Sequence, residues 1–198
     1  MENDHFVCPW RAGPILTASI RKLFHNPRRI LSPYLADGIT AMDVGCGMGF
    51  FTIPMSDMVG KNGNVIAVDL QAEMLEGLKK NAEKAGAENI TRRQCAQDSL
   101  RIKQWNGTVD FALVFWMLHE VPDPKRLIKE LYAALSPNGK LLFAEPLAHV
   151  NSAAFQTSVK MITESGLKAV GTPKIPVSRA VLFSIKKVKK HTYLYFKK

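Results

Sequence analysis

Three glycines separated by single residues, Gly45, Gly47 and Gly49, follow an apolar run that contains Asp43. Glycine has no side chain, so a ligand can approach the backbone of such a loop closely. A glycine-rich turn between a first strand and a first helix is where α/β sheets bind nucleotide-like ligands. The loop therefore predicts a cofactor site.

The spacing of the loop and the acids near it indicate the kind of cofactor. The dinucleotide fingerprint is Gly-x-Gly-x-x-Gly, and here Phe50 occupies the place of the third glycine. Asp43 would place a carboxylate near a ligand's ammonium group, and it would sit poorly beside a pyrophosphate. Asp69 ends a second apolar run, where an acid accepts hydrogen bonds from ribose hydroxyls. Because Asp69 would serve NAD equally well, a nicotinamide-dependent oxidoreductase remains an alternative.

Short apolar runs alternate with helical stretches, which is the pattern of a parallel α/β sheet. The expected strands are 39–44, 65–68, 90–94, 109–115 and 140–144, and the expected helices are 49–58, 71–85, 124–135 and 151–165. Beyond Gly166 the alternation stops, and 167–171 with 180–185 predict a hairpin-like sheet edge. Residues 191–196 are either a further strand or a tail.

Several segments resemble the motifs of class I S-adenosylmethionine-dependent methyltransferases. Residues 42–50 resemble motif I, 65–69 the acidic second motif, and 109–114 the fourth-strand motif. Residues 118–121 and 135–141 resemble segments of the subgroup that includes quinone-biosynthesis and arsenite methyltransferases. The match runs in order from about residue 38 to about residue 145.

The resemblance implies an α/β, Rossmann-like, doubly wound fold. Its mostly parallel seven-stranded sheet would have an antiparallel C-terminal edge and a short N-terminal helical arm. We expect a single domain over residues 1–198, with an arm or lid at 1–35 and the core with a basic end at 36–198. The arm contains Trp10, which is either a lid residue or an anchor on the core.

The resemblance also implies a set of residues that hold S-adenosylmethionine. They are Asp43, Gly45, Cys46, Gly47, Gly49, Phe50, Asp69, Leu70, Met74, Cys95, Ala96, Asp98, Phe115 and Trp116. The glycines would line the methionine portion, with Asp43 nearby, and Asp69 would hold the ribose. Leu70 and Met74 would pack near adenine.

Two parts of this set concern the adenine amine and the sulfonium. Where the family has an Asp-Ala pair that contacts the adenine amine, this chain has Cys95-Ala96, with Asp98 two residues beyond. Either Asp98 reaches the amine or backbone groups replace it. Phe115 and Trp116, at the end of the fourth strand, would border the sulfonium and the path of the methyl group.

Methyl transfer from a sulfonium is an in-line displacement whose reactivity lies in the cofactor. The protein supplies alignment and excludes water, and it needs a base only if the acceptor loses a proton. The candidate catalytic residues each follow a predicted strand: His119, Glu120, Glu145 and His149. Because the chain shows no separate substrate domain, a small-molecule acceptor is favoured. A non-catalytic S-adenosylmethionine-binding module remains an alternative.

The net charge of +10 is unevenly distributed, because residues 179–198 hold seven basic residues and no acids. Such an end can attract nucleic acid, although it is more often a solvated face. An RNA methyltransferase therefore remains possible but is not favoured. Residues 115–118 lack the Asn/Asp-Pro-Pro-Tyr type of motif that marks methylation of exocyclic amines.

The remaining features exclude some classes of protein. The chain has 3 cysteines, and their wide spacing argues against a disulfide framework or a metal site. An arsenite-like activity would need Cys8 and Cys95 to converge with another thiol, and Cys46, in the cofactor loop, is a poor third ligand. With no secretory signal and no apolar run of membrane-spanning length, we expect a cytoplasmic protein. The sequence leaves the oligomeric state open.

Overall fold

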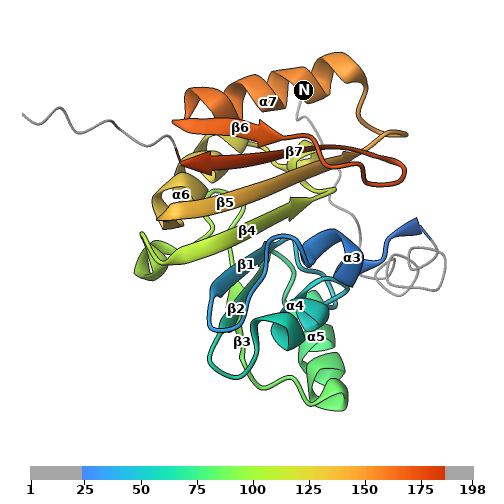
Figure 1. Ribbon diagram of the computed structural model, residues 1–198, viewed down its shortest axis with the longest axis vertical. Helices are drawn as coiled ribbons and strands as arrows, with labels where there is room; N and C mark the ends of the chain where they lie inside the picture. Colours follow the sequence, from blue (N-terminus) through green and yellow to red (C-terminus); the bar gives the residue numbers. More distant parts are fainter. Residues whose placement is uncertain (1–23, 186–198) are drawn as a thin grey trace, which may run out of the picture.

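A mixed sheet with the strand order β3-β2-β1-β4-β5-β7-β6 organises the chain (Figure 1). The computed structural model describes residues 24–185. The strands are β1 (Thr40–Val44), β2 (Asn64–Asp69), β3 (Ile90–Gln94), β4 (Val109–Phe115), β5 (Leu135–Pro146), β6 (Leu167–Gly171) and β7 (Ser178–Ile185). Strands β1 to β5 pair in parallel, and β7 pairs antiparallel with both β5 and β6. This confirms the predicted Rossmann-like sheet with an antiparallel C-terminal edge.

Helices cover both faces of the sheet. They are α3 (Pro27–Leu31), α4 (Thr52–Val59), α5 (Ala72–Ala85), α6 (Pro124–Ala134) and α7 (Ser152–Glu164), with short 3₁₀ turns η2 (Lys103–Trp105) and η3 (Leu118–Glu120). In β4, Phe111 and Leu113 pack with α3 and α4, while Ala112 and Val114 pack with α6 and α7. A strand buried on both faces reads as a continuous apolar run, which explains the sequence of β4. Within residues 24–185, no helix combines the length and apolar character needed to cross a bilayer.

Several element boundaries differ from the sequence prediction. Helix α4 begins at Thr52, because Gly49 still adopts a φ of +95° and the chain continues to turn before the helix starts. Strand β5 begins at Leu135 and not at residue 140, so that Pro137, Asn138 and Gly139 lie within the strand. A shift in the β4–β5 register, between Val109 and Phe111, accommodates the extra residues as a bulge does.

Some expectations fall on residues that the structure does not describe. Helix α3 lies within the predicted N-terminal arm, but the rest of that arm, including Cys8 and Trp10, lies outside residues 24–185. The segment 191–196 and the basic residues after Ile185 also lie outside the described range.

The sheet topology brings distant segments to one edge. Since β1, β2, β4 and β5 are parallel, their carboxyl ends meet at the same side of the sheet, where α/β folds bind ligands. The antiparallel strand β7 enters at that same side, because its first residues, Ser178 and Arg179, pair with Pro146 and Glu145. The loops around this edge therefore form the candidate site.

Candidate cofactor and active site

The three glycines of the loop after β1 have three different surroundings. All have positive φ angles, +74° at Gly45, +52° at Gly47 and +95° at Gly49. A Cβ placed on Gly45 would lie 2.9 Å from Met117 Cγ, and one on Gly49 would lie 2.5 Å from Leu78 Cδ1. A Cβ on Gly47 would meet nothing described within 4 Å. Close approach by a ligand is therefore possible at Gly47, whereas the other two glycines make room for side chains of the protein.

Asp69 closes the loop from the end of β2. Its Oδ2 accepts a hydrogen bond from the Gly47 amide at 2.8 Å, and its Oδ1 accepts one from the Gln71 amide at 3.0 Å. Burial raises the pKa of Asp69, while these amides oppose the rise. Each carboxylate oxygen offers two lone pairs, so the group retains capacity to accept two hydroxyls. This arrangement suits a ribose diol.

Asp43, near the end of β1, is buried under the loop. Its Oδ2 accepts a hydrogen bond from the Thr52 hydroxyl at 2.6 Å. Thr52 is the first residue of α4, so the carboxylate lies at the positive end of that helix. The contact with Thr52 gives Asp43 a partner in the fold, in addition to the role that the sequence predicts for it beside the cofactor.

The segment after β3 contains Cys95, Ala96 and Asp98, which the sequence predicts near the adenine amine. The Cys95 amide donates to the Asp69 carbonyl at 2.9 Å, which brings Cys95 and Ala96 beside the cofactor loop. Burial, assisted by the charge of Asp69, raises the pKa of Cys95 to about 11, so this thiol is neutral at physiological pH. Asp98 is exposed, and its Oδ2 lies 3.6 Å from Arg126 Nη1. The backbone of Ala96 is itself hydrogen-bonded to Ser99, so the group that meets the adenine amine stays a prediction.

The other predicted cofactor residues line the same region. Met74 is buried in the first turn of α5, and Leu70, which directly follows Asp69, is half-buried. Cys46 is buried too, and burial raises the pKa of its thiol well above the usual value. Phe50 is half-buried, with its ring 5.0 Å from the ring of Phe51. Except for Asp98, the predicted set gathers around the ends of β1 to β4.

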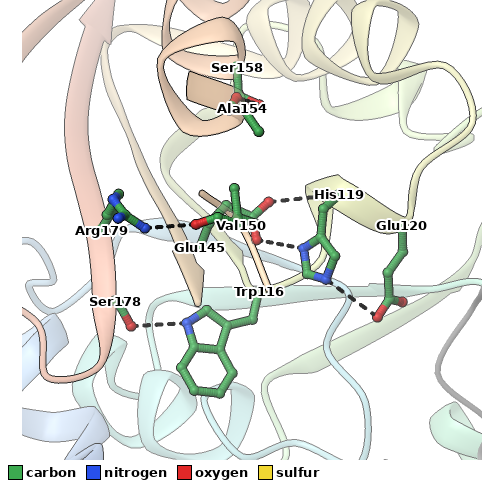
Figure 2. Close-up of polar contacts among 9 residues, drawn as sticks. All are labelled: Trp116, His119, Glu120, Glu145, Val150, Ala154, Ser158, Ser178 and Arg179. Atoms are coloured by element: carbon green, nitrogen blue, oxygen red, sulfur yellow. Dashed lines mark hydrogen bonds and ion pairs between the residues drawn. The ribbon is translucent and has the colours of Figure 1, made fainter. Parts of the chain in front are cut away.

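Trp116, directly after β4, has a φ of +60°. Successive strand residues normally point to opposite faces. Here the rings of Phe115 and Trp116 lie 5.6 Å apart at an interplanar angle of 28°, because the left-handed conformation turns the indole back to the side of Phe115. Such a conformation costs a bulky residue about 1–3 kcal/mol. The indole Nε1 donates to Ser178 Oγ at 2.9 Å, a contact that helps to offset this cost (Figure 2).

His119 and Glu145 are joined by two hydrogen bonds at this edge (Figure 2). Glu145 Oε2 lies 2.7 Å from His119 Nδ1, and its Oε1 accepts from the His119 amide at 3.1 Å. The carboxylate is almost fully buried, and its hydrogen bond raises the pKa of His119 although partial burial opposes the rise. Glu120 Oε1 lies 4.0 Å from His119 Nε2, and the ring of His149 lies 6.2 Å from that of His119. The four predicted catalytic residues therefore come together around one imidazole.

Four residues of this site were missed by the sequence analysis: His25, Thr52, Met117 and Ser178. The sequence could have indicated Met117 as a site residue, because it directly follows Trp116 at the end of a strand. Ser178 had none, since it lies 62 positions from the indole that it contacts. Among residues 24–185, no group of three or more His, Cys, Asp or Glu side chains is arranged to hold a metal ion.

The fold is α/β, and the loop geometry at the ends of its parallel strands fits a nucleoside-containing cofactor. The "Methyltransferase domain" family model matches residues 35–194. The chain belongs to this family, the class I S-adenosylmethionine-dependent methyltransferases. The open backbone of Gly47 and the remaining capacity of Asp69 fit S-adenosylmethionine, and the family sets aside the nicotinamide alternative.

Individual relatives agree with the family. The arsenite methyltransferase of Aquipseudomonas alcaligenes is 29% identical over 124 residues, which cover 60% of this chain and 36% of that protein. The demethylmenaquinone methyltransferase of Lactobacillus johnsonii is 33% identical over 106 residues, covering 52% of this chain and 42% of that protein. This chain thus matches less than half the length of either relative. A solved SAM-dependent methyltransferase from Aquifex aeolicus shares the fold, with a TM-score of 0.81 and 23% identity over 90% of this chain and 100% of that one.

The different surroundings of Gly47 and Gly49 predict different effects of alanine. Gly47→Ala should lower stability by only about 1–2 kcal/mol, the cost of a left-handed residue, and should weaken binding of S-adenosylhomocysteine. Gly49→Ala should destabilise the fold more, because its Cβ would overlap Leu78. Thermal denaturation and calorimetric titration measure the two effects. Equal losses of stability in both variants would contradict this assignment.

The His119–Glu145 pair predicts a pH-dependent contribution to stability. The pKa of His119 is higher in the folded than in the unfolded chain, so its contribution is complete below the unfolded pKa and is lost as the pH rises through the folded pKa. The melting temperature of the wild type should therefore exceed that of His119→Gln by more at about pH 5.5 than at about pH 9.

The matched control is the same substitution in a Glu145→Gln background. Without the carboxylate, the effect of His119→Gln should be similar at both pH values. An advantage of the wild type that grows with pH would refute the ion pair.

Proposed function

We propose that the protein transfers a methyl group from S-adenosylmethionine to a small-molecule acceptor at the carboxyl ends of β4 and β5. The observation that supports this most is that a candidate cofactor loop and a candidate base lie at the same edge of the sheet. The loop after β1 offers an open backbone at Gly47, and Asp69 offers a buried carboxylate. His119 with Glu145 offers an oriented base.

The chain's own residues bind and align the reactants. The sulfonium supplies an electrophilic methyl group, so the protein needs to orient it and exclude water. Asp69 accepts the ribose hydroxyls, the Gly47 backbone approaches the methionine portion, and Asp43 provides negative charge beneath the loop. Phe115 and Trp116 form an aromatic wall at the end of β4 that keeps water from the transfer path.

His119 acts as the general base for an acceptor that loses a proton. Glu145 accepts the Nδ1 proton, which leaves Nε2 as the basic nitrogen and stabilises the imidazolium that forms. The raised pKa makes His119 a stronger base than an unpaired histidine. Glu120, 4.0 Å from Nε2, adds to this stabilisation.

The names of the relatives support a small acceptor. Two of them are named for methylating arsenite and demethylmenaquinone. Since this chain spans less than half of each relative, we propose only a small-molecule acceptor and no particular compound. Because the chain is basic, RNA is the alternative acceptor against which a small molecule is tested.

The cofactor part of the proposal is tested by calorimetric titration with S-adenosylhomocysteine and, separately, with NAD. The wild type should bind S-adenosylhomocysteine, and Asp69→Asn should bind it at least about tenfold more weakly, because one charge-assisted acceptor is lost. Asp57→Asn, an exposed acid on α4, is the matched control and should bind normally. Binding of NAD alone would overturn the proposal.

The base is tested by following labelled methyl transfer to arsenite, to demethylmenaquinol and to total RNA. For an acceptor that loses a proton, His119→Asn should lower kcat about 10²-fold or more. The wild-type rate should rise with pH through a pKa above 6.5, because the neutral imidazole is required, and Glu145→Gln should move this rise to lower pH. Wild-type rates in His119→Asn would exclude the base, and methylation of RNA alone would exclude a small acceptor.

A further inference from the structure

The loop after β1 and the turn after β4 contact each other through Met117. Strand β4 lies between β1 and β5, so the residues that follow it have the cofactor loop on one side and the end of β5 on the other. A Cβ placed on Gly45 would lie 2.9 Å from Met117 Cγ and 3.1 Å from Met117 Cβ. Since Cβ is bonded to the backbone, this contact depends on the position of the Met117 backbone as well as on its rotamer. The side chain of Met117 therefore packs directly against the backbone of Gly45.

Met117 also begins the turn that carries the proposed base. It directly precedes η3, and its carbonyl accepts a hydrogen bond from the Glu120 amide at 3.0 Å, which closes the turn around His119. Leu118, in the same turn, is buried in the core and anchors it there. A displacement of Met117 would therefore displace His119 as well.

The turn is held from the side of β5 by hydrogen bonds. The Trp116 amide donates to the Ala144 carbonyl at 2.8 Å. The His119 amide donates to Glu145 Oε1 at 3.1 Å, and the Glu145 carboxylate also meets the imidazole (Figure 2). From the side of β1, the packing of Met117 on the cofactor loop supports the turn. The turn is thus fixed between its two neighbours in the sheet.

We infer that Met117 is a positioning residue, whose packing on Gly45 sets the distance between the cofactor loop and His119. This inference rests on the proposed methyl transfer. A base must reach the acceptor while the acceptor faces the methyl group, and a displacement of about 1 Å can lower the rate of an aligned reaction about 10²-fold. Met117 acts through the turn and not on the reacting atoms. In this role, the missing side chain of Gly45 makes room for the base segment and not for the ligand.

The experiment follows the histidine imidazoles of the full chain, without cofactor, by NMR over a pH titration. The His119 signal is identified by its absence in His119→Gln. The titratable groups that face His119 are Glu120 in η3, Glu145 in β5 and His149 after β5, and the hydrogen bond from Glu145 raises the pKa of His119. Gly45→Ala should lower this pKa toward that of an unpaired histidine. The added Cβ displaces the turn, and contacts already at hydrogen-bond distance weaken when their geometry changes.

Matched variants separate this effect from backbone strain. Gly47→Ala introduces the same left-handed alanine, at a φ of +52°, where a Cβ meets no described atom within 4 Å. It should leave the titration of His119 unchanged. In a Met117→Ala background, which lacks the overlapping Cγ, Gly45→Ala should change the titration much less than in the wild type. In a Met117→Leu background, which keeps a Cγ, the effect of Gly45→Ala should persist.

The inference has outcomes that overturn it. A contact that only stabilises the fold would lower the melting temperature of Gly45→Ala and leave the titration of His119 as in the wild type. An equal change in Gly47→Ala, or an undiminished change in the Met117→Ala background, would also overturn the role of Met117. If Gly45→Ala does not fold, the melting temperature decides: the double variant Gly45→Ala/Met117→Ala should fold, and its failure to fold would contradict the inference.

These results are distinguishable from those that test the proposed function. If S-adenosylhomocysteine does not bind to the wild type, the proposed function fails and the positioning role fails with it. If S-adenosylhomocysteine binds but Gly45→Ala leaves the titration of His119 unchanged, the role of Met117 is wrong and the proposed function stands.

Discussion

The hydrogen bond from the Gly47 amide to the carboxylate of Asp69 joins the two strands on which the cofactor site depends. It forms because β1 and β2 are parallel neighbours in register, so that the residues just after Val44 meet the end of β2. The Gly45 and Cys46 amides both donate to the Val68 carbonyl, which continues the pairing into the loop. A buried carboxylate needs such amides, and the loop needs such an acceptor, so each stabilises the other.

The proposed cofactor half and the proposed acceptor half of the site are built differently. Asp43 and the glycine loop belong to one short segment, and Asp69 follows after one helix, so this half is encoded locally. Around the proposed base and near Trp116, contacts are long-range: His119 meets Glu145 from 26 positions away, and His25 meets Pro176 from 151 positions away.

This difference decides how much could be predicted from the sequence. The apolar run of β4 predicted a strand buried on both faces, and the structure confirms it. The glycine spacing with Asp69 predicted a cofactor loop; the structure brings Gly47 and Asp69 together, and their contact with the cofactor stays a prediction. The contact between Trp116 and Ser178 could not be predicted, because period-two alternation places Trp116 on the face opposite Phe115. Only the left-handed backbone at Trp116, which tertiary contacts stabilise, reverses that direction. The early start of β5 at Leu135 was hidden for a similar reason, since a Pro-Asn-Gly sequence indicates a turn unless a neighbouring strand pairs with it.

The antiparallel direction of β7 has a consequence for anything attached beyond it. Ser178 begins β7 beside the active-site edge, whereas Ser184 pairs with Lys140 near the start of the parallel segment of β5. The 8 residues of β7 span roughly 26 Å at the usual rise of an extended strand. The chain therefore leaves the described fold on the side away from the cofactor loop. A label attached to the side chain at position 184 would therefore lie at the far end of β7 from Ser178 and away from the proposed site.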